Sequence, residues 1–220
     1  MYYNYVFLDL DGTLTDPAEG ITNSVAYSLT HYGITVENKK ELECFIGPPL
    51  YASYEKYYGF SHDKAIEAVE KYREYFSDKG IFENRLYDGT KEFLGKLKKE
   101  GKKIILATSK PEVYAVRILE HFDILKYFDE TVGSLLSGER VNKDEVIKEA
   151  LKRTSNPPLE NCIMIGDRSH DIIGAKKNNM CAIGILHGYG SVKELQGAGA
   201  DFIVKNYSEA QNIILNGCWT

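Results

Sequence analysis

The sequence has few cysteines, little proline and no long apolar run. Its 220 residues include four cysteines and six prolines, and the cysteines form no C-x-x-C pair. Scattered cysteines suit a reducing compartment, so we expect a cytoplasmic protein with Cys162 and Cys181 as small buried thiols. The longest apolar runs have only the length of a strand, so the sequence predicts no transmembrane helix.

The chain also lacks an excess of positive charge. Its formal net charge of −5 argues against a nucleic-acid polymer as partner, because phosphate backbones need basic patches. Residues 1–5 contain no basic segment leading into an apolar stretch, so we expect no secretory signal. An acidic chain that handles phosphate needs local cations, either a metal ion or a few placed lysines. A small molecule is therefore the expected partner, with monomer and homodimer both open.

What the chain does contain is an alternation of short β-rich runs and helical patterns. Six runs are expected to form strands: Tyr5–Leu8, Lys103–Ala107, Glu130–Val132, Asn161–Ile165, Cys181–Ile185 and Asp201–Val204. Apolar stripes at helical spacing lie between them: Phe93, Leu94, Leu97; Val113, Val116, Leu119; Val146, Ile147, Ala150, Leu151; and Ile172, Ile173, Ala175. This alternation predicts an α/β fold, a doubly wound parallel (Rossmann-like) sheet with helices on both faces.

Residues 16–86 break this rhythm, because they carry helical patterns and no convincing strand. One helical face is formed by Ile21, Val25, Leu29 and Tyr32 and is closed by Gly33. Another is formed by Ile66, Val69, Tyr72 and Phe76, after an expected cap at Ser61 or Asp63. We therefore expect an all-helical cap domain at residues 16–86, inserted into a core of residues 1–15 and 87–220.

Two aspartates, Asp9 and Asp11, follow the apolar run Tyr5–Leu8 and open into Gly12. An apolar strand that ends this way delivers two carboxylates to the carboxyl edge of the sheet, where open α/β folds place their chemistry. Two anions so close repel each other. They therefore imply either a bound cation or one carboxyl that stays protonated.

Three further polar groups are expected at the same edge. Residues 108–111 (TSKP) follow the strand Lys103–Ala107 and are expected to begin a helix, where a hydroxyl and free N–H groups bind an anion. Lys143 is expected at the start of a later helix, and residues 166–171 (GDRSHD) directly follow another strand. Oxygen ligands without a histidine–cysteine cluster favour Mg2+ over zinc, and Asp9 and Asp167 suit that ion. A carboxylate nucleophile beside a metal ion and a lysine is a workable route to phosphoryl transfer.

These residues resemble the four motifs of the haloacid dehalogenase-like superfamily. Residues 9–16 (DLDGTLTD), Thr108, Lys143 and residues 166–171 lie in the family's order and span nearly the whole chain. Residues 45–50 (FIGPPL) resemble the cap loop of the phosphoglycolate phosphatase and 5′-nucleotidase-like branch. The first motif is highly specific, whereas the threonine and lysine motifs are short.

The resemblance implies a Mg2+-dependent, two-step hydrolysis of a phosphomonoester, with a 5′-nucleotide or 2-phosphoglycolate as the leading substrate. Asp9 is the implied nucleophile, and Asp11 the acid/base that protonates the leaving oxygen and then activates water. The implied metal ligands are the Asp9 carboxylate, the Asp11 carbonyl and Asp167, with Asp171 acting nearby through water or by positioning Lys143. The implied phosphate-binding residues are Gly12, Thr108, Ser109 and Lys143, and the implied substrate loop of the cap is Gly47, Pro48 and Pro49.

Several alternatives stay open. Lys110 rivals Lys143, because Lys143 lies in the context VNKD and many relatives have Lys-Pro-x-Pro there; Arg168 likewise stands where serine is common. A phosphosugar mutase similar to β-phosphoglucomutase would keep the site, but its first motif tends to lack Thr13. A phospho-acceptor signalling domain would be shorter and lack the insert. The segment Gly188-Tyr189-Gly190 is expected to be a flexible turn first and a substrate loop second.

Overall fold

The computed structural model describes residues 3–217 and divides into two compact units. The first, here called the core unit, consists of Met1–Thr15 and Leu86–Thr220, and the second, the helical unit, of Asp16–Arg85. Residues 1 and 2, at the start of the segment searched for a signal, lie outside the described residues. None of the helices in residues 3–217 is both long and apolar enough to span a lipid bilayer.

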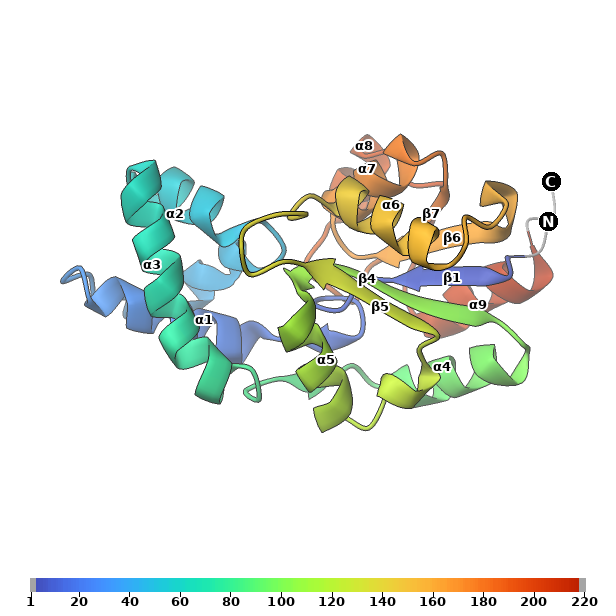
Figure 1. The fold of residues 1–220 in the computed structure, drawn as a ribbon, viewed down its shortest axis with the longest axis horizontal. Coiled ribbons are helices and arrows are strands. Elements are labelled where there is room, and N and C mark those ends of the chain that lie inside the picture. The colour runs from blue at the N-terminus through green and yellow to red at the C-terminus, as the bar shows by residue number, and fades with distance from the viewer. Residues whose placement is uncertain (1–2, 218–220) are drawn as a thin grey trace. The chain divides into compact units, whose positions relative to one another are not determined.

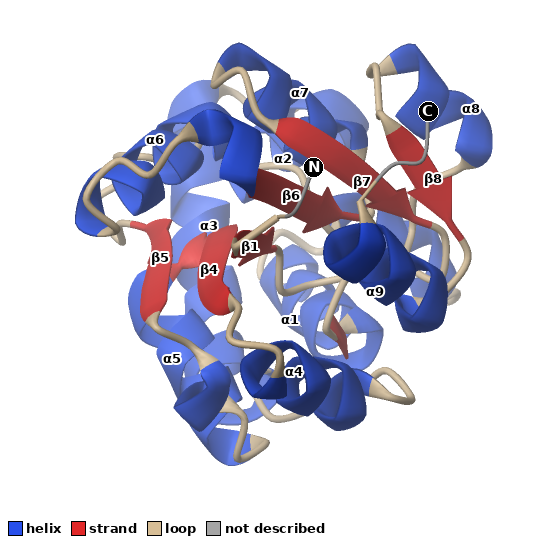
Figure 2. Ribbon diagram, turned by 90° about the vertical axis from the view of Figure 1, so that its right-hand side faces the viewer, coloured by secondary structure: helices blue, strands red, loops and turns tan. Residues whose placement is uncertain are grey.

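The core unit is built on a parallel sheet (Figures 1 and 2). Within residues 3–217 this sheet has six strands in the order β5-β4-β1-β6-β7-β8. The strands are β1 Tyr5–Leu8, β4 Lys103–Pro111, β5 Glu130–Ser134, β6 Cys162–Gly166, β7 Cys181–Ile185 and β8 Phe202–Val204. The predicted doubly wound parallel sheet is confirmed, and each expected strand is present with its ends shifted by at most a few residues.

Helices cover both faces of this sheet. They are α4 Thr90–Lys99, α5 Glu112–His121, α6 Lys143–Arg153, α7 Ser169–Lys177, α8 Val192–Gly197 and α9 Tyr207–Asn216. Figure 2 shows α6 and α7 on one face and α4, α5 and α9 on the other. The apolar strands are therefore buried from both sides, as their unbroken runs of Val, Ile, Leu and Phe require.

The buried face of α6 matches its predicted stripe, but two other stripes differ. Val113 of α5 and Ile173 of α7, both expected to be buried, are 52% and 43% exposed. Ile173 follows the buried Ile172, and neighbouring residues on a helix point about 100° apart, so both cannot face the sheet. The buried face of α5 consists of Ala115, Ile118 and Leu119, of which Leu119 belongs to the predicted stripe. The expectation for the thiols holds for Cys162, which is buried, whereas Cys181 is only partly so.

Strand β4 is longer than expected, and this moves the helix that follows it. We predicted a helix beginning at Thr108, but β4 continues to Pro111, with an irregularity between Ala107 and Pro111, and α5 begins at Glu112. The residue before a proline is disfavoured in the α region, so Lys110 holds the chain extended up to Pro111. Thr108 therefore lies in an extended segment and not at a helix N-terminus.

The helical unit contains α1 Ala18–Thr30, α2 Leu50–Tyr58, α3 His62–Tyr75 and the short helical turns Lys39–Phe45 and Phe76–Gly80. Ser61 caps α3, because its hydroxyl accepts a hydrogen bond from the Lys64 N–H at 3.4 Å. The buried face of α3 is Ala65, Ala68 and Tyr72. Tyr72 and the following Phe76 are buried as predicted, whereas Ile66 is exposed and Val69 is only partly buried. The expectation that residues 16–86 contain no strand was wrong at the two ends of this segment, where β2 Thr15–Asp16 pairs with β3 Arg85–Leu86.

Candidate active site

Strand register brings the chemically important residues of the core unit to one edge of the sheet. Leu8, the last residue of β1, pairs with Leu106 in β4 and with Ile165 in β6. The next residue of each strand therefore lies at the same height, and the Asp9 N–H donates to the Ile165 carbonyl at 3.0 Å. This register explains how residues as far apart in the sequence as Asp9 and Asp167 meet at the carboxyl ends of neighbouring strands.

Three buried carboxylates gather at this edge. Asp9, Asp167 and Asp171 each offer a carboxylate oxygen, and these oxygens lie within 4.8 Å of one another. Burial raises the pKa of Asp167 well above its usual value, and the charges of Asp171 and Asp9 raise it further. Burial likewise raises the pKa of Asp171 to about 6, with Lys143 opposing the shift. A cation placed among these oxygens would relieve both the desolvation and the repulsion.

Lys143 is a fixed positive charge within this cluster. It is the first residue of α6, and its ammonium lies 2.7 Å from Asp9 Oδ1, 2.8 Å from Asp171 Oδ1 and 3.1 Å from the Ala107 carbonyl. Burial alone would lower the pKa of Lys143, but the neighbouring Asp171 and Asp9 outweigh it and raise the pKa. The lysine therefore stays protonated while almost wholly buried, which suits a group that must neutralise an anion.

Asp11 has a different partner. Its Oδ2 accepts from the Lys110 ammonium at 2.5 Å, and its buried Oδ1 has no hydrogen-bond partner among residues 3–217. Burial raises the pKa of Asp11, although Lys110 opposes the shift. The two rival lysines thus contact two different aspartates, Lys143 the first of the pair and Lys110 the second.

The predicted phosphate-binding residues lie beside these pairs, with one qualification. The Thr108 hydroxyl is buried and accepts from the Lys110 N–H at 3.3 Å, which leaves its own proton for another acceptor. The Ser109 carbonyl is held by the Ser134 hydroxyl at 2.8 Å. The Gly12 N–H, however, already donates to the Thr15 carbonyl at 2.7 Å, so Gly12 supplies a tight turn and not a spare donor.

The predicted substrate loop of the cap belongs to the helical unit. Gly47 has a φ of 102°, which only glycine adopts readily, and Pro49 forms the N-cap of α2. Gly47, Pro48 and Pro49 therefore form a turn that leads into α2 of the helical unit.

Comparison with known proteins identifies the family. A family model described as haloacid dehalogenase-like hydrolase matches residues 6–185. The chain belongs to this family. The chain is therefore an enzyme of the haloacid dehalogenase-like phosphatase type, and the matched range includes both aspartates of the first motif, Lys143 and the Asp167/Asp171 pair.

Individual relatives agree with the family match. The chain is 45% identical over 194 residues to a 5′-nucleotidase of Pseudomonas aeruginosa, covering 88% of this chain and 87% of that protein. It resembles the crystal structure of a predicted phosphatase from Clostridium acetobutylicum with a TM-score of 0.94 and 48% identity, covering 97% and 99% of the two chains. It is also 37% identical over 200 residues to the tyrosine-protein kinase PtkA of Mycobacterium tuberculosis. This match covers 91% of this chain and 65% of that protein.

Sequence reasoning missed two contributors to this haloacid dehalogenase-like site. The Thr13 hydroxyl donates to Asp167 Oδ1 at 3.3 Å, and the Tyr189 N–H donates to Asp167 Oδ2 at 2.8 Å. A signal for the second was present, because residues 188–190 follow β7 at the same carboxyl edge of the sheet. The two glycines of this segment predict a flexible turn, but in the structure the backbone at Gly188 and Gly190 lies directly against Asp167.

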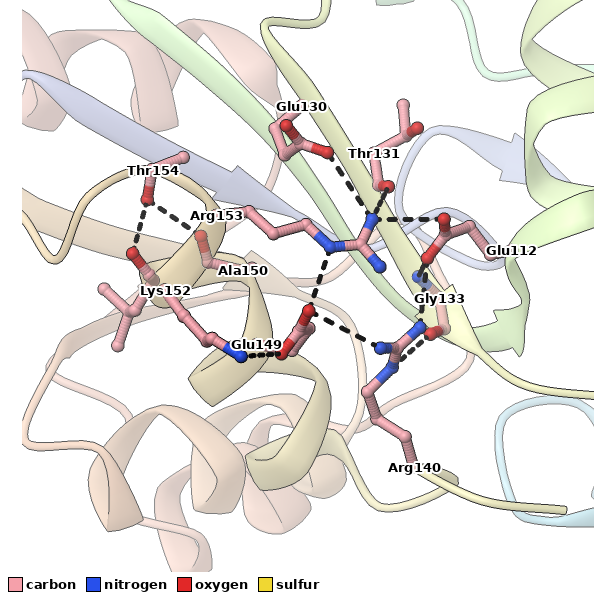
Figure 3. Close-up of polar contacts among 11 residues, drawn as sticks. Glu112, Glu130, Thr131, Gly133, Arg140, Glu149, Ala150, Lys152, Arg153 and Thr154 are labelled. Carbon is pink, nitrogen blue, oxygen red and sulfur yellow. Dashed lines mark hydrogen bonds and ion pairs between the residues drawn. The ribbon is translucent and has the colours of Figure 1, made fainter.

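A network of charged side chains surrounds Glu112 in the core unit of this hydrolase (Figure 3). Glu112, the first residue of α5, accepts from Arg153 at 3.1 Å, from Arg140 at 3.1 Å and from the Gly133 N–H at 3.1 Å. Arg140 also donates to the Gly133 carbonyl at 2.8 Å, and Arg153 to Glu149 at 3.1 Å. The network thereby joins the start of α5, the end of β5 and helix α6, which carries Lys143.

Proposed function

We propose that this chain is a Mg2+-dependent phosphomonoesterase that hydrolyses a small soluble phosphate ester through an aspartyl-phosphate intermediate. The observation that carries the proposal is the environment of Asp9, a buried carboxylate 2.7 Å from the Lys143 ammonium and clustered with two further carboxylates. A nucleophilic carboxylate can approach an anionic phosphate only where positive charge offsets the repulsion. Lys143 supplies part of that charge, and a metal ion would supply the rest.

The residues present fit a magnesium ion. The side chains of Asp9 and Asp167 and the Asp11 carbonyl are hard oxygen ligands, and among the described residues the cluster includes no histidine or cysteine. The fit is supported by Oδ1 of Asp11, a buried acceptor with no hydrogen-bond partner among residues 3–217. When bound, Mg2+ would neutralise phosphoryl oxygens and draw the ester toward Asp9.

The two aspartates of the first motif divide the chemistry. Asp9 would attack phosphorus and form the acyl phosphate as the bond from phosphorus to the ester oxygen breaks. Asp11 would give its proton to that leaving oxygen, and its raised pKa keeps more of the carboxyl protonated near neutral pH. Asp11 would then take a proton from the water that attacks phosphorus, and this second step frees phosphate and restores Asp9.

The remaining residues would hold the phosphoryl group. Lys143, whose ammonium contacts the carbonyl of Ala107, and the neighbouring Thr108 hydroxyl would bind non-bridging oxygens, together with Ser109. Asp171 would position Lys143, since its Oδ1 lies 2.8 Å from the ammonium and its Oδ2 accepts the Arg168 N–H at 3.1 Å. Asp171 therefore acts through the lysine and not on the ester itself.

A 5′-nucleotide is the first substrate to test, with 2-phosphoglycolate next. The support is the 45% identity to the Pseudomonas aeruginosa 5′-nucleotidase, together with similarity to phosphoglycolate phosphatases at lower identity. We propose that the helical unit is the cap that reads the leaving group, through the turn at Gly47, Pro48 and Pro49.

The test is phosphate release from a panel of 5′-nucleotides, 2-phosphoglycolate, sugar phosphates and phosphotyrosine, with Mg2+ and with EDTA. Asp9→Asn keeps the size of the side chain but removes the nucleophile, so we expect its activity to fall to background. Unchanged activity in Asp9→Asn would exclude the proposed nucleophile. Isomerised glucose phosphate without phosphate release would indicate a mutase, and a phospho-aspartate that persists for hours would indicate a signalling domain.

A further inference from the structure

The carboxylate of Asp167 is held on both oxygens by groups from distant parts of the chain. Thr13, from the first motif, donates its hydroxyl to Oδ1, and the Tyr189 backbone N–H donates to Oδ2 at 2.8 Å. Each carboxylate oxygen has two lone-pair directions, so each retains one for a cation. The two donors fix the rotation of the carboxylate and thus the direction in which the remaining lone pairs point.

The Tyr189 contact requires the backbone to approach unusually closely. A Cβ atom added at Gly188 would lie less than 3.0 Å from both the Gly12 carbonyl oxygen and Asp167 Oδ2. One added at Gly190 would overlap the Asp167 carbonyl oxygen in the same way. Neither Gly188 nor Gly190 has a positive φ, so space and not backbone conformation excludes a side chain at these positions.

The same segment is anchored to the first motif by its other end. His187 Nε2 donates to the Thr13 carbonyl at 2.9 Å, which requires the tautomer with a proton on Nε2. The Tyr207 hydroxyl also donates to that carbonyl, at 2.6 Å. The ring of His187 packs against the ring of Tyr87, with the two ring centroids 4.4 Å apart. Thr13 thus contacts Asp167 through its side chain while its carbonyl is fixed by His187 and Tyr207.

We propose that residues 187–190 form a metal-positioning loop, which orients the Asp167 carboxylate for a divalent cation through the Tyr189 N–H and the close approach of Gly188. The proposal rests on the metal site of the proposed function and adds a chain segment to it. Tyr189 and Gly188 are positioning residues, because they act through Asp167 and not on the ester.

The test measures Mg2+ binding by calorimetry in the absence of substrate. Gly188→Ala places a methyl group against the Gly12 carbonyl and Asp167, and we expect its Mg2+ affinity to fall about 10- to 100-fold, as for other partners of metal ligands. Gly197→Ala is the matched control, since Gly197 in α8 has no atom within 4 Å of an added Cβ and no positive φ. Equal Mg2+ affinity in Gly188→Ala and the wild-type protein would overturn the proposal.

A second measurement keeps the test decisive if Gly188→Ala does not fold. In wild-type protein labelled with 15N-tyrosine, the Tyr189 amide resonance is assigned by its loss in Tyr189→Phe. We expect it to move on addition of Mg2+, because its acceptor Oδ2 belongs to a metal ligand. Tyr189→Ala keeps the N–H, so its Mg2+ affinity should stay within about threefold of wild type, well inside the 10-fold loss expected for a broken contact.

Failure of this proposal is distinguishable from failure of the phosphatase proposal. A wild-type protein that binds Mg2+ but hydrolyses no ester would contradict the proposed phosphatase function but not the proposed role of the metal-positioning loop. An active enzyme whose Tyr189 amide resonance does not move on addition of Mg2+ would contradict the proposed metal-positioning loop but not the proposed phosphatase function.

Discussion

At the scale of single residues, two buried lysines hold two different aspartates. Lys143 contacts Asp9 and Asp171, and Lys110 contacts Asp11. This division suggests different duties: Lys143 would offset the charge of the nucleophile and the phosphoryl group, and Lys110 would tune the acid/base. Their separate partners follow from where each residue enters the sheet edge, one from α6 and the other from β4.

Replacing each lysine with methionine should separate these duties. Lys143→Met removes a charge that faces the reacting group, so we expect kcat to fall roughly 100- to 1,000-fold at every pH. Lys110→Met removes an interaction that lowers the pKa of Asp11, so that pKa should rise and the alkaline limb of the kcat profile should move to higher pH. Steady-state kinetics across pH measure both effects.

The control is Lys96→Met, which removes only an exposed ion pair with Glu100 on α4 and should leave the profile unchanged. A Lys110→Met enzyme that loses as much kcat as Lys143→Met, without a shift of its alkaline limb, would assign the phosphoryl-binding duty to Lys110.

At the scale of elements, the strands could be predicted because they are unbroken apolar runs. The residues at which some elements begin or end could not be predicted. Tyr5–Leu8 and Cys181–Ile185 match the prediction residue for residue. The helix expected at Thr108 failed because Ser134 of β5 and Pro111 extend β4, and pairing between strands cannot be read from either segment alone. The prediction that Lys143 lies at the start of a helix is confirmed, because α6 begins at Lys143.

The network around Glu112 provides a test at this scale. Glu112→Ala removes the acceptor of the Gly133 N–H and one of the several acceptors of Arg140 and of Arg153, and we expect a loss of roughly 1–2 kcal/mol in unfolding free energy, since the site is partly exposed. Because Glu112 begins the helix after residues 108–111, KM should also rise. Urea unfolding and steady-state kinetics measure the two effects.

Lys152→Ala is the control within the same network (Figure 3). The Lys152 ammonium lies 4.0 Å from Glu149 and the side chain is mostly exposed, so stability should change by no more than about 0.5 kcal/mol. Similar losses in the two variants would mean that Glu112 is an ordinary surface ion pair.

At the scale of the whole molecule, the sheet and the identity of Asp9, Asp11 and Asp167 as candidates followed from the sequence, but the contacts among them did not. Alternating strand and helix patterns determine a doubly wound sheet, and the sheet brings strand ends together whatever residues they carry. The Tyr189 N–H on Asp167 is a backbone contact, which side-chain patterns do not encode. Arg140, in the segment before α6, and Arg153, at the end of α6, similarly owe their partners to the position of these segments against β5.

The carboxylate cluster also links the stability of the molecule to pH and to Mg2+. The pKa of Asp171 is raised from 3.8 to about 6, and that of Asp167 is raised as well, so the folded state binds these protons more tightly than the unfolded chain does. The contribution of Asp171 to stability is therefore fully present below about pH 4 and is lost as the pH rises through about 6, and that of Asp167 likewise falls with rising pH. Above that pH the folded protein keeps ionised carboxylates together, and a divalent cation should stabilise it most there.

We therefore expect millimolar Mg2+ to raise the Tm more at about pH 7.5 than at about pH 5, because protons compete with the ion at low pH. Differential scanning fluorimetry with Mg2+ or EDTA at both values measures the difference. Asp167→Asn is the decisive comparison: it removes one charge from the cluster, so its Tm in EDTA at about pH 7.5 should exceed that of the wild type, and its response to Mg2+ should disappear. A Mg2+-induced rise in Tm that is as large at the lower pH, or that survives in Asp167→Asn, would mean that the ion binds somewhere other than this cluster.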